Sequence, residues 1–407
     1  MKIIFLDSGL KGISNFTRLV PGLLKTLPGV EIKLIFNDSW RGHVTEPVVN
    51  LPGFRGYDIS TYGTNSYYRV LKREKPDLVV TLNNYFLLDK AINVICRKLK
   101  IPVVYLSHGR LSGREMAMSL PSYKRDMKKP PKINKDNFLI LSNYLKSTLL
   151  RGKPWMFFSS LWALATKPGT MLATSLYNEE LKVDKNLVYF NSCKDIMVKE
   201  RGFPADNIHV VGNPEFDSFH NSSVAPIKSI YPNLREGQKY ILYLEDGFLQ
   251  NGIMNKEQWM KHLAEINESV KATGNKLAIK FHPRTDIVPL KDFLEEEDID
   301  FFGKEADMKS LISHSEGVIS VFSTTITFAL IMGKNVWSPR WDATEKIAKN
   351  YPENVIRYVY SPEELKRAIT GGETTNRNEN YLQQEVGTPD GQSINRIVKH
   401  LCSIIPA

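Results

Sequence analysis

A chain of 407 residues exceeds the usual size of one compact domain, so its length predicts two domains. Its 42% hydrophobic and 24% charged residues are typical of a globular protein, and no apolar run reaches the roughly 20 residues of a membrane span. The chain starts with a strand pattern rather than a signal peptide, and its three cysteines form no CxxC pair. We therefore expect a cytoplasmic protein without a disulfide framework or a zinc site.

The first half of the chain alternates strand and helix patterns, which predicts repeated βαβ units and a parallel sheet. Apolar runs predict strands at residues 2–7, 31–36, 77–82, 102–106, 187–190 and 208–214. Helical spacing of apolar residues predicts helices at residues 13–26, 86–99 and 193–201.

The second half repeats this pattern after a polar segment, residues 215–238, whose Ser, Asn and Pro content is typical of a linker. It predicts strands at 240–244, 277–281, 317–321 and 335–337, and helices at 256–272, 325–332 and 362–369. The predicted fold is α/β, with two Rossmann-like, doubly wound domains, residues 1–220 and 221–407, that face each other across a cleft. This architecture is called GT-B and is used by many nucleotide-sugar glycosyltransferases.

An acidic pair before a glycine, Glu245-Asp246-Gly247, follows the predicted strand 240–244. Ligands bind at the carboxyl ends of strands in open α/β sheets, and a carboxylate there can deprotonate an acceptor hydroxyl. The glycine permits the tight turn that exposes the acid. The alternative is a solvated turn without a catalytic role.

Two further polar groups stand at the ends of the next predicted strands. His282, followed by Pro283 and Arg284, can hydrogen-bond or protonate a departing phosphate, with the guanidinium pairing beside it. Ser323, Thr324 and Thr325 lie at a predicted helix start, where free amides and hydroxyls form an anion site. The alternatives are a histidine that binds a loop carbonyl and an ordinary helix N-cap.

Together, in this order, the three groups resemble the bacterial sialyltransferases and polysialyltransferases, which share an acidic-acidic-Gly motif, a His-Pro motif and a downstream Ser/Thr pair. The resemblance covers roughly residues 185–340. It implies an inverting, metal-independent glycosyltransferase without a cofactor, which moves a CMP-activated acidic sugar such as sialic acid onto a glycan or lipid-linked glycan of the bacterial surface. It also implies that Glu245 is the general base, that His282 protonates the CMP phosphate, and that Ser323 and Thr324 hold the phosphate or the donor carboxylate.

The first half offers a second candidate base. Ser107-His108-Gly109 ends the predicted strand 102–106, and this His-Gly resembles the base of the teichoic-acid glycerophosphotransferases, which also use a His-Pro in the other domain. That resemblance implies a polymerase with a CDP-activated polyol as its donor. The alternative is that His108 and Gly109 line the acceptor side of the cleft without a catalytic role. The base is thus either Glu245 or His108, and a non-catalytic glycan- or nucleotide-binding protein of the same fold is a third hypothesis.

The net charge of +10 is concentrated in residues 119–170, where ten Lys or Arg face only Asp126 and Asp136. Lys124, Arg125, Lys128, Lys129 and Lys132 precede a segment that contains the aromatic residues Trp155, Phe157, Phe158 and Trp162. Basic and aromatic residues together favour an anionic membrane surface, here the inner face of the cytoplasmic membrane. The alternative is a solvated loop followed by a core helix.

Other motif classes are missing from the sequence. No nucleic-acid-binding module, P-loop or serine-hydrolase elbow occurs, and no DxD motif stands at a predicted strand end. Gly9 and Gly12 after the first strand form only part of a dinucleotide fingerprint.

Overall fold

The computed structural model describes the chain except for residues 43–45, 85, 112, 114–118, 120, 122–133, 151, 153, 167–179, 181, 222, 283–284, 372–378, 388–389 and 406–407. The chain forms two compact units. The first contains Met1–Leu111, Asp126–Asp217 and Asp390–Ala407, and the second is formed mainly by Ser218–Pro389.

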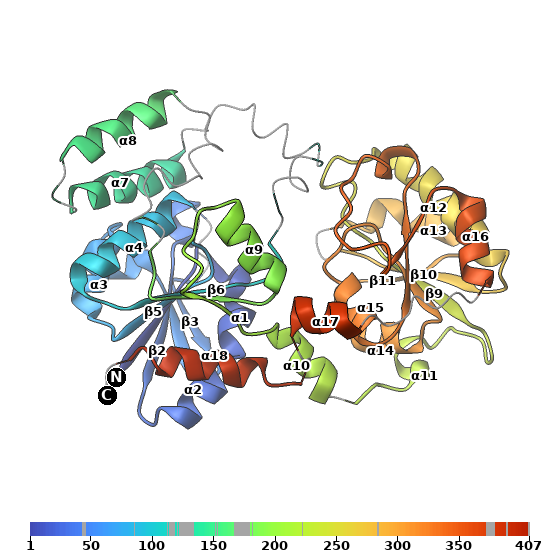
Figure 1. Ribbon diagram of the computed structural model, residues 1–407, viewed down its shortest axis with the longest axis horizontal. Coiled ribbons are helices and arrows are strands. Elements are labelled where there is room, and N and C mark those ends of the chain that lie inside the picture. The colour runs from blue at the N-terminus through green and yellow to red at the C-terminus, as the bar shows by residue number, and fades with distance from the viewer. Residues whose placement is uncertain are drawn as a thin grey trace. The chain divides into compact units, whose positions relative to one another are not determined.

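The first unit is built on a sheet of eight strands in the order β3-β4-β2-β1-β5-β6-β7-β8 (Figure 1). The strands are β1 Lys2–Leu6, β2 Glu31–Phe36, β3 Val48–Leu51, β4 Phe54–Asp58, β5 Leu78–Thr81, β6 Val103–Leu106, β7 Lys185–Val188 and β8 Ile208–Val210. Every neighbouring pair is parallel except β3 with β4, which pair antiparallel at the edge. The predicted parallel sheet is confirmed.

Helices connect these strands. The described ones are α1 Ile13–Thr17, α2 Val20–Thr26, α3 Tyr67–Glu74, α4 Leu87–Leu99, α7 Lys135–Leu149, α8 Pro154–Thr166, α9 Asn191–Lys199, α10 Pro214–Asn221 and α18 Ser393–Cys402. Short 3-10 helices follow three strands: η1 Leu10–Gly12, η2 Asp38–Trp40 and η3 Ile59–Tyr62. The predicted helix 13–26 is two helices, because Pro21 stands in the first turn of α2 and cannot continue α1.

The second unit is built on a parallel sheet of six strands in the order β11-β10-β9-β12-β13-β14. This is the Rossmann strand order. The strands are β9 Tyr240–Leu244, β10 Lys276–Lys280, β11 Asp300–Phe302, β12 Gly317–Ile319, β13 Asn335–Pro339 and β14 Arg357–Val359. Its helices are α11 Ile227–Ile230, α12 Lys256–Lys271, α13 Lys291–Glu296, α14 Met308–His314, α15 Ile326–Ile331, α16 Pro362–Thr370 and α17 Glu379–Val386, with η6 Val288–Leu290 and η7 Asp342–Thr344.

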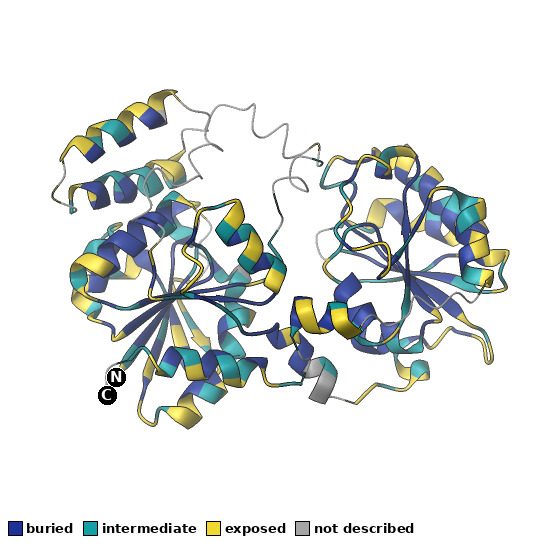
Figure 2. Ribbon diagram, viewed as in Figure 1, coloured by how far each residue is buried: buried dark blue, intermediate teal, exposed yellow. Residues whose placement is uncertain are grey.

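The central strands are apolar along their whole length because helices cover both faces of each sheet. All five residues of β9 and all four of β5 are buried. The predicted apolar stripe of α12, Trp259, Leu263, Ile266 and Val270, packs into the core of the second unit. Figure 2 shows the buried strands of each sheet and the helices that expose their outer faces.

The C-terminal helix corrects the expected division at residue 220. Residues 390–407 belong to the first unit, where α18 packs against α2. The Asp217 carboxylate accepts hydrogen bonds from the backbone N–H groups of Ser393 and Ile394, at 3.0 and 2.9 Å. The expected second domain, 221–407, therefore ends before α18. The segment 215–238 also differs from a simple linker, because it contains most of α10 and all of α11.

A buried glycine tests how tightly the second sheet is packed. A Cβ at Gly317 of β12 would lie 2.3 Å from the Trp337 ring, so Gly317→Ala forces that indole to move. We expect a loss of about 1–3 kcal/mol in the free energy of unfolding, the usual cost of overpacking. The measurement is urea denaturation followed by tryptophan fluorescence.

The matched control is Gly303→Ala, because a Cβ there would meet only Ile287, at 4.0 Å. Equal stability of the two variants would contradict the tight packing of β12 against Trp337.

Candidate functional site

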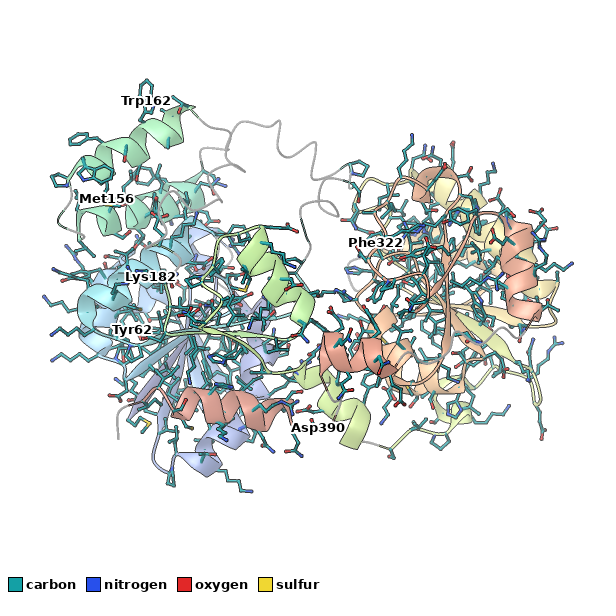
Figure 3. All side chains as sticks on the ribbon, in the orientation of Figure 1. Tyr62, Met156, Trp162, Lys182, Phe322 and Asp390 are labelled. Carbon is teal, nitrogen blue, oxygen red and sulfur yellow. The ribbon has the colours of Figure 1, made fainter. Side chains whose placement is uncertain are left out.

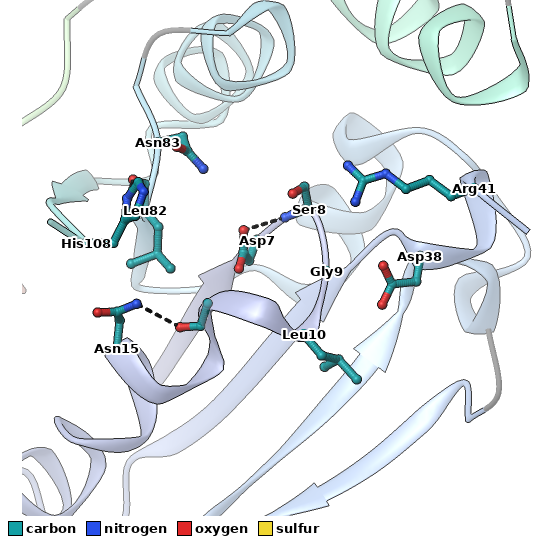
Figure 4. A pocket seen from close by; sticks show the side chains of 11 residues that line it. Asp7, Ser8, Gly9, Leu10, Asn15, Asp38, Arg41, Leu82, Asn83 and His108 are labelled. Carbon is teal, nitrogen blue, oxygen red and sulfur yellow. Dashed lines mark hydrogen bonds between the residues drawn. The ribbon is translucent and has the colours of Figure 1, made fainter. Parts of the chain in front are cut away.

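The first unit has a cavity at the point where its strand order reverses. β1 lies between β2 and β5. The chain continues from β1 to β2 on one side of β1 and later returns to β5 on the other side, which opens a crevice at the carboxyl ends of these strands. A cavity of about 820 Å³ occupies this position (Figure 4). Its lining residues follow β1, β2, β5 and β6: Asp7, Ser8, Gly9, Leu10, Gly12, Asn15, Asp38, Arg41, Leu82, Asn83 and His108.

His108 reaches this cavity from the end of β6. Its Nδ1 lies 3.0 Å from the carbonyl oxygen of Leu82. A carbonyl can only accept a hydrogen bond, so Nδ1 carries a proton, and in the neutral ring the lone pair lies on Nε2. The side chain is exposed, and Gly109 beside it is half-buried. The structure therefore places the predicted His108 beside this cavity, with Nδ1 bound to the Leu82 carbonyl.

Asp7 stands beside His108 at the end of β1. Partial burial raises the pKa of Asp7, while the Ser8 N–H, which donates to the carboxylate at 2.7 Å, acts in the opposite direction. A Cβ at Gly12 would lie 2.3 Å from an Asp7 carboxylate oxygen, so only glycine lets the η1 backbone approach the acid this closely. Gly12, which forms part of a dinucleotide fingerprint in the sequence, thus shapes the cavity around Asp7.

Arg41 links the cavity to a second one of about 330 Å³. Both are lined by Asp7, Ser8, Arg41 and Asn83, and the Arg41 Nε donates to Asp136 of α7 at 3.1 Å. Neither Asp7 nor Arg41 was predicted from the sequence as a site residue. The position of Asp7, directly after a predicted strand of the same parallel sheet as His108, was the signal that could have identified it.

The second unit holds the acidic pair at its own strand-order reversal, between β9 and β12. Glu245 is buried, and its carboxylate accepts hydrogen bonds from the Phe248 N–H at 3.0 Å, the His282 N–H at 3.3 Å and the Thr285 hydroxyl at 3.0 Å. Gly247 has a φ of 71°, the left-handed region that glycine adopts without strain. The Glu245 carboxylate therefore organises its own turn and the end of β10.

Asp246 binds the end of the neighbouring strand. Its carboxylate accepts the backbone N–H groups of Val321 and Phe322, at 2.8 and 3.0 Å, and the Ser320 hydroxyl at 3.2 Å. Burial raises the pKa of Asp246 to about 7, although the two N–H groups favour its charged form. The acid is thus held inside the crevice.

The other predicted residues of this unit gather at the same edge. His282 is half-buried and its backbone is tied to Glu245, while Pro283 and Arg284 lie outside the described residues. The Ser323 hydroxyl accepts from the N–H and the hydroxyl of Thr325, at 3.2 and 2.6 Å, and Thr324 is exposed. The structure therefore brings the acidic pair close to His282 and to the β12 loop.

A buried arginine that was not predicted from the sequence supports this loop. The Arg340 guanidinium donates to the carbonyl oxygens of Val321 and Ile347, at 3.2 and 2.6 Å, and stacks on the Tyr358 ring at 4.9 Å. Burial lowers the pKa of Arg340, and its neighbours, including Asp246, oppose that shift. Arg340 thus holds the segment that carries the Asp246 partners.

Comparison with known proteins informs the fold. No family model matches the sequence, and no curated protein matches it. Among solved structures, the wall teichoic acid polymerase TagF with CDPG is 13% identical, with a TM-score of 0.56 over 99% of this chain and 88% of that one. The UDP-GlcNAc 2-epimerase from Neisseria meningitidis bound to UDP-GlcNAc is 14% identical, with a TM-score of 0.53 over 99% of this chain and 100% of that one.

This chain has the GT-B fold. A UDP-GlcNAc 2-epimerase from Methanocaldococcus jannaschii agrees, at 16% identity and a TM-score of 0.53 over 98% of this chain and 100% of that one. The predicted α/β class with two Rossmann-like sheets is confirmed. At these identities the likeness concerns the fold alone, so the reaction has to be argued from the site residues.

The raised pKa of Asp246 predicts a dependence of stability on pH. The folded-state pKa of about 7 lies above the ordinary value of 3.8, so the proton stabilises the fold fully below the ordinary value, and this stability is lost as the pH rises through 7. The Asp246→Asn variant lacks this titration. The free energy of unfolding of the wild type, relative to the variant, should fall between about pH 4 and about pH 8.

Urea denaturation across this pH range measures the difference. The exposed Asp292 offers a control, because Asp292→Asn should leave the pH dependence of the wild type unchanged. If the difference in stability between the wild type and the Asp246→Asn variant stays constant with pH, the pKa of Asp246 is the same in the folded and unfolded states.

Proposed function

We propose that the chain is a transferase that moves a group from a nucleotide-activated donor to a hydroxyl of a bacterial surface polymer, with His108 as the general base. The observation that carries this proposal is the hydrogen bond from His108 Nδ1 to the Leu82 carbonyl. It orients the ring so that, in its neutral form, the lone pair of Nε2 lies beside a cavity large enough for an acceptor end. The GT-B fold, shared with enzymes solved with CDPG and UDP-GlcNAc, supports a nucleotide-activated donor.

The contacts of Glu245 argue against its role as the base. A general base needs a free lone pair within reach of the acceptor hydroxyl. The two Glu245 oxygens accept three hydrogen bonds from their own turn and from the end of β10, and the residue is buried. Substitution of Glu245 would therefore destabilise this turn and would not remove a free base.

The proposed reaction is a phosphoryl-group transfer from a CDP-activated polyol. The acceptor hydroxyl gives its proton to His108 Nε2, its oxygen forms a bond to the phosphorus next to the polyol, and the bond to the bridging oxygen breaks. CMP leaves with the bonding electron pair. In the second unit, His282 and the Ser323 loop stand at the strand ends where a departing phosphate binds in such folds. Neither a cofactor nor a catalytic metal takes part in this scheme.

A second candidate is the transfer of a CMP-activated acidic sugar. It is favoured by the clustering of Glu245, Asp246, His282 and Ser323 at one sheet edge, in the order of the sialyltransferase-like motifs. In that case the acceptor oxygen attacks the sugar carbon and CMP again departs. Both reactions release CMP, so the base and the donor have to be tested separately.

Substitution of the two candidate bases separates the hypotheses. His108→Asn keeps a group that can donate to Leu82 but removes the basic nitrogen, and we expect turnover to fall by about 100-fold or more. Glu245→Gln should keep most of the activity of the wild type if the protein folds. The measurement is CMP release at saturating donor, with CDP-glycerol and CMP-sialic acid each offered with a surface-polymer acceptor.

His209→Asn is the matched control, because His209 lies on β8 of the same unit outside both cavities. Loss of turnover in Glu245→Gln, with unchanged donor binding and an active His108→Asn, would overturn the proposed base and favour sugar transfer. Donor binding without turnover by any donor would favour the non-catalytic hypothesis.

We also propose that the first unit attaches to an anionic membrane surface through α8. The helix contains no charged residue, and it exposes 58% of Trp155, 67% of Phe158 and 73% of Trp162. Trp162 projects from α8 on the side away from α7, which packs against it (Figure 3). The basic residues 124–132 that we predicted to contribute lie outside the described residues. In the described part of the chain, no helix has the length and apolarity needed to cross a bilayer.

Replacement of the exposed aromatic residues tests this attachment. The triple variant Trp155→Ser, Phe158→Ser, Trp162→Ser should lose most of its binding to vesicles that contain anionic lipid, because these rings supply the apolar contact. Vesicle sedimentation at low and high salt measures the effect. Salt should weaken the binding of the wild type to the vesicles, since basic residues contribute to it. Val288→Ser, an exposed apolar residue of the second unit, is the control. Wild-type protein that does not sediment at low salt would contradict the attachment.

A further inference from the structure

Three potential metal ligands meet beside α12, outside the strand-end residues described above. They are His262 and Glu265, which are one helical turn apart, and Asp342 at the start of η7. One ligand atom from each lies within 4.8 Å of the others. Residues three apart on a helix share a face, so His262 and Glu265 point together toward the segment that follows β13.

The buried histidine is the observation that sets this cluster apart from an ordinary acidic surface. His262 is only 2% exposed, and among the described residues neither of its ring nitrogens has a hydrogen-bond partner. A buried polar group without a partner destabilises a fold, and such groups need a specific explanation.

The two carboxylates are positioned beside this ring. Glu265 accepts a hydrogen bond from the Trp341 indole N–H at 3.0 Å, which holds its side chain toward η7. Asp342 has a φ of 52°, a left-handed conformation that is uncommon outside glycine. Lys261 approaches Glu265 at 3.7 Å but is exposed, so it competes only weakly for that carboxylate.

The geometry points to a binding site for a divalent transition metal ion of the Zn²⁺ type, with one imidazole nitrogen and two carboxylate oxygens as ligands. Imidazole favours Zn²⁺ and its neighbours over Mg²⁺ and Ca²⁺, which prefer oxygen alone. Ligand atoms in a tetrahedral zinc site are about 3.5 Å apart, so side-chain movements of about 1 Å close this cluster around an ion. A water molecule can supply the fourth ligand.

The ion would act on structure and not on the transferred group. It would join α12 to the segment after β13, whose Arg340 binds the β12 loop. The His262 ring also packs against Phe248, at 6.3 Å between ring centroids, and the Phe248 N–H binds Glu245. A metal bound to His262 would therefore stabilise the turn that contains Glu245 and Asp246. The site does not depend on the proposed reaction.

Binding of Zn²⁺ to the chelator-treated full chain tests the inference. We expect one ion per chain by calorimetry, a rise in melting temperature on adding Zn²⁺, and Co²⁺ absorption bands typical of a four-coordinate site. Asp342→Asn and Glu265→Gln should each weaken Zn²⁺ binding by at least tenfold and remove the rise in melting temperature. Asn accepts the left-handed conformation at position 342, and Gln can still accept from Trp341, so both variants should fold.

Glu268→Gln, an exposed carboxylate on the same helix, is the matched control and should bind Zn²⁺ as the wild type does. His262→Phe should abolish binding while keeping the ring buried. The inference is overturned if the wild type binds less than one ion, or if Asp342→Asn and Glu265→Gln bind Zn²⁺ as tightly as the wild type. Unchanged Zn²⁺ binding by these two variants would mean that the ion binds elsewhere on the chain.

Discussion

The buried Asp246 carboxylate is the contact on which the second unit's strand-end site depends. Where the connections from two neighbouring parallel strands run to opposite sides of a sheet, N–H groups beyond the strand ends are left free, and Asp246 at the end of β9 accepts those that follow β12. Glu245 makes the equivalent connection to β10. The acidic pair thus joins three strand ends, and Arg340 supports the same loop from the other side. The position of the Ser323 loop follows from these contacts.

The same principle produces a different site in the first unit. There Asp7 accepts the N–H of the adjacent Ser8 and His108 binds the Leu82 carbonyl through one ring nitrogen, and a cavity remains between Asp7, Asn83 and His108. The contrast is chemical. Buried carboxylates that accept backbone N–H groups act as structural braces, whereas a histidine anchored through one nitrogen retains reactivity at the other. The polar residues at the two strand-order reversals therefore make different contacts in the two units.

Most strands could be predicted because a central parallel strand is buried on both faces and is therefore continuously apolar. The edge hairpin of β3 and β4 was missed, since β3 is half-exposed and carries no such signal. The placement of α18 was also unpredictable, because it depends on hydrogen bonds to Asp217, 176 residues earlier. The sequence located Glu245 and His282 at strand ends, but only the folded backbone reveals which atoms their side chains bind. His262 and Glu265 have a recognisable helical spacing, yet their third partner comes from a distant loop.

The attachment of α18 to the first unit has a consequence for the order of assembly on the ribosome. The second unit is inserted into the first, so the first unit's last helix emerges only after the whole second unit has been synthesised. Until then the face of α2 that α18 covers, including Gly22 beside the future position of Val398, stays without its partner. The N-terminal unit is thus the last to be completed during translation, although its sheet is the first to be made.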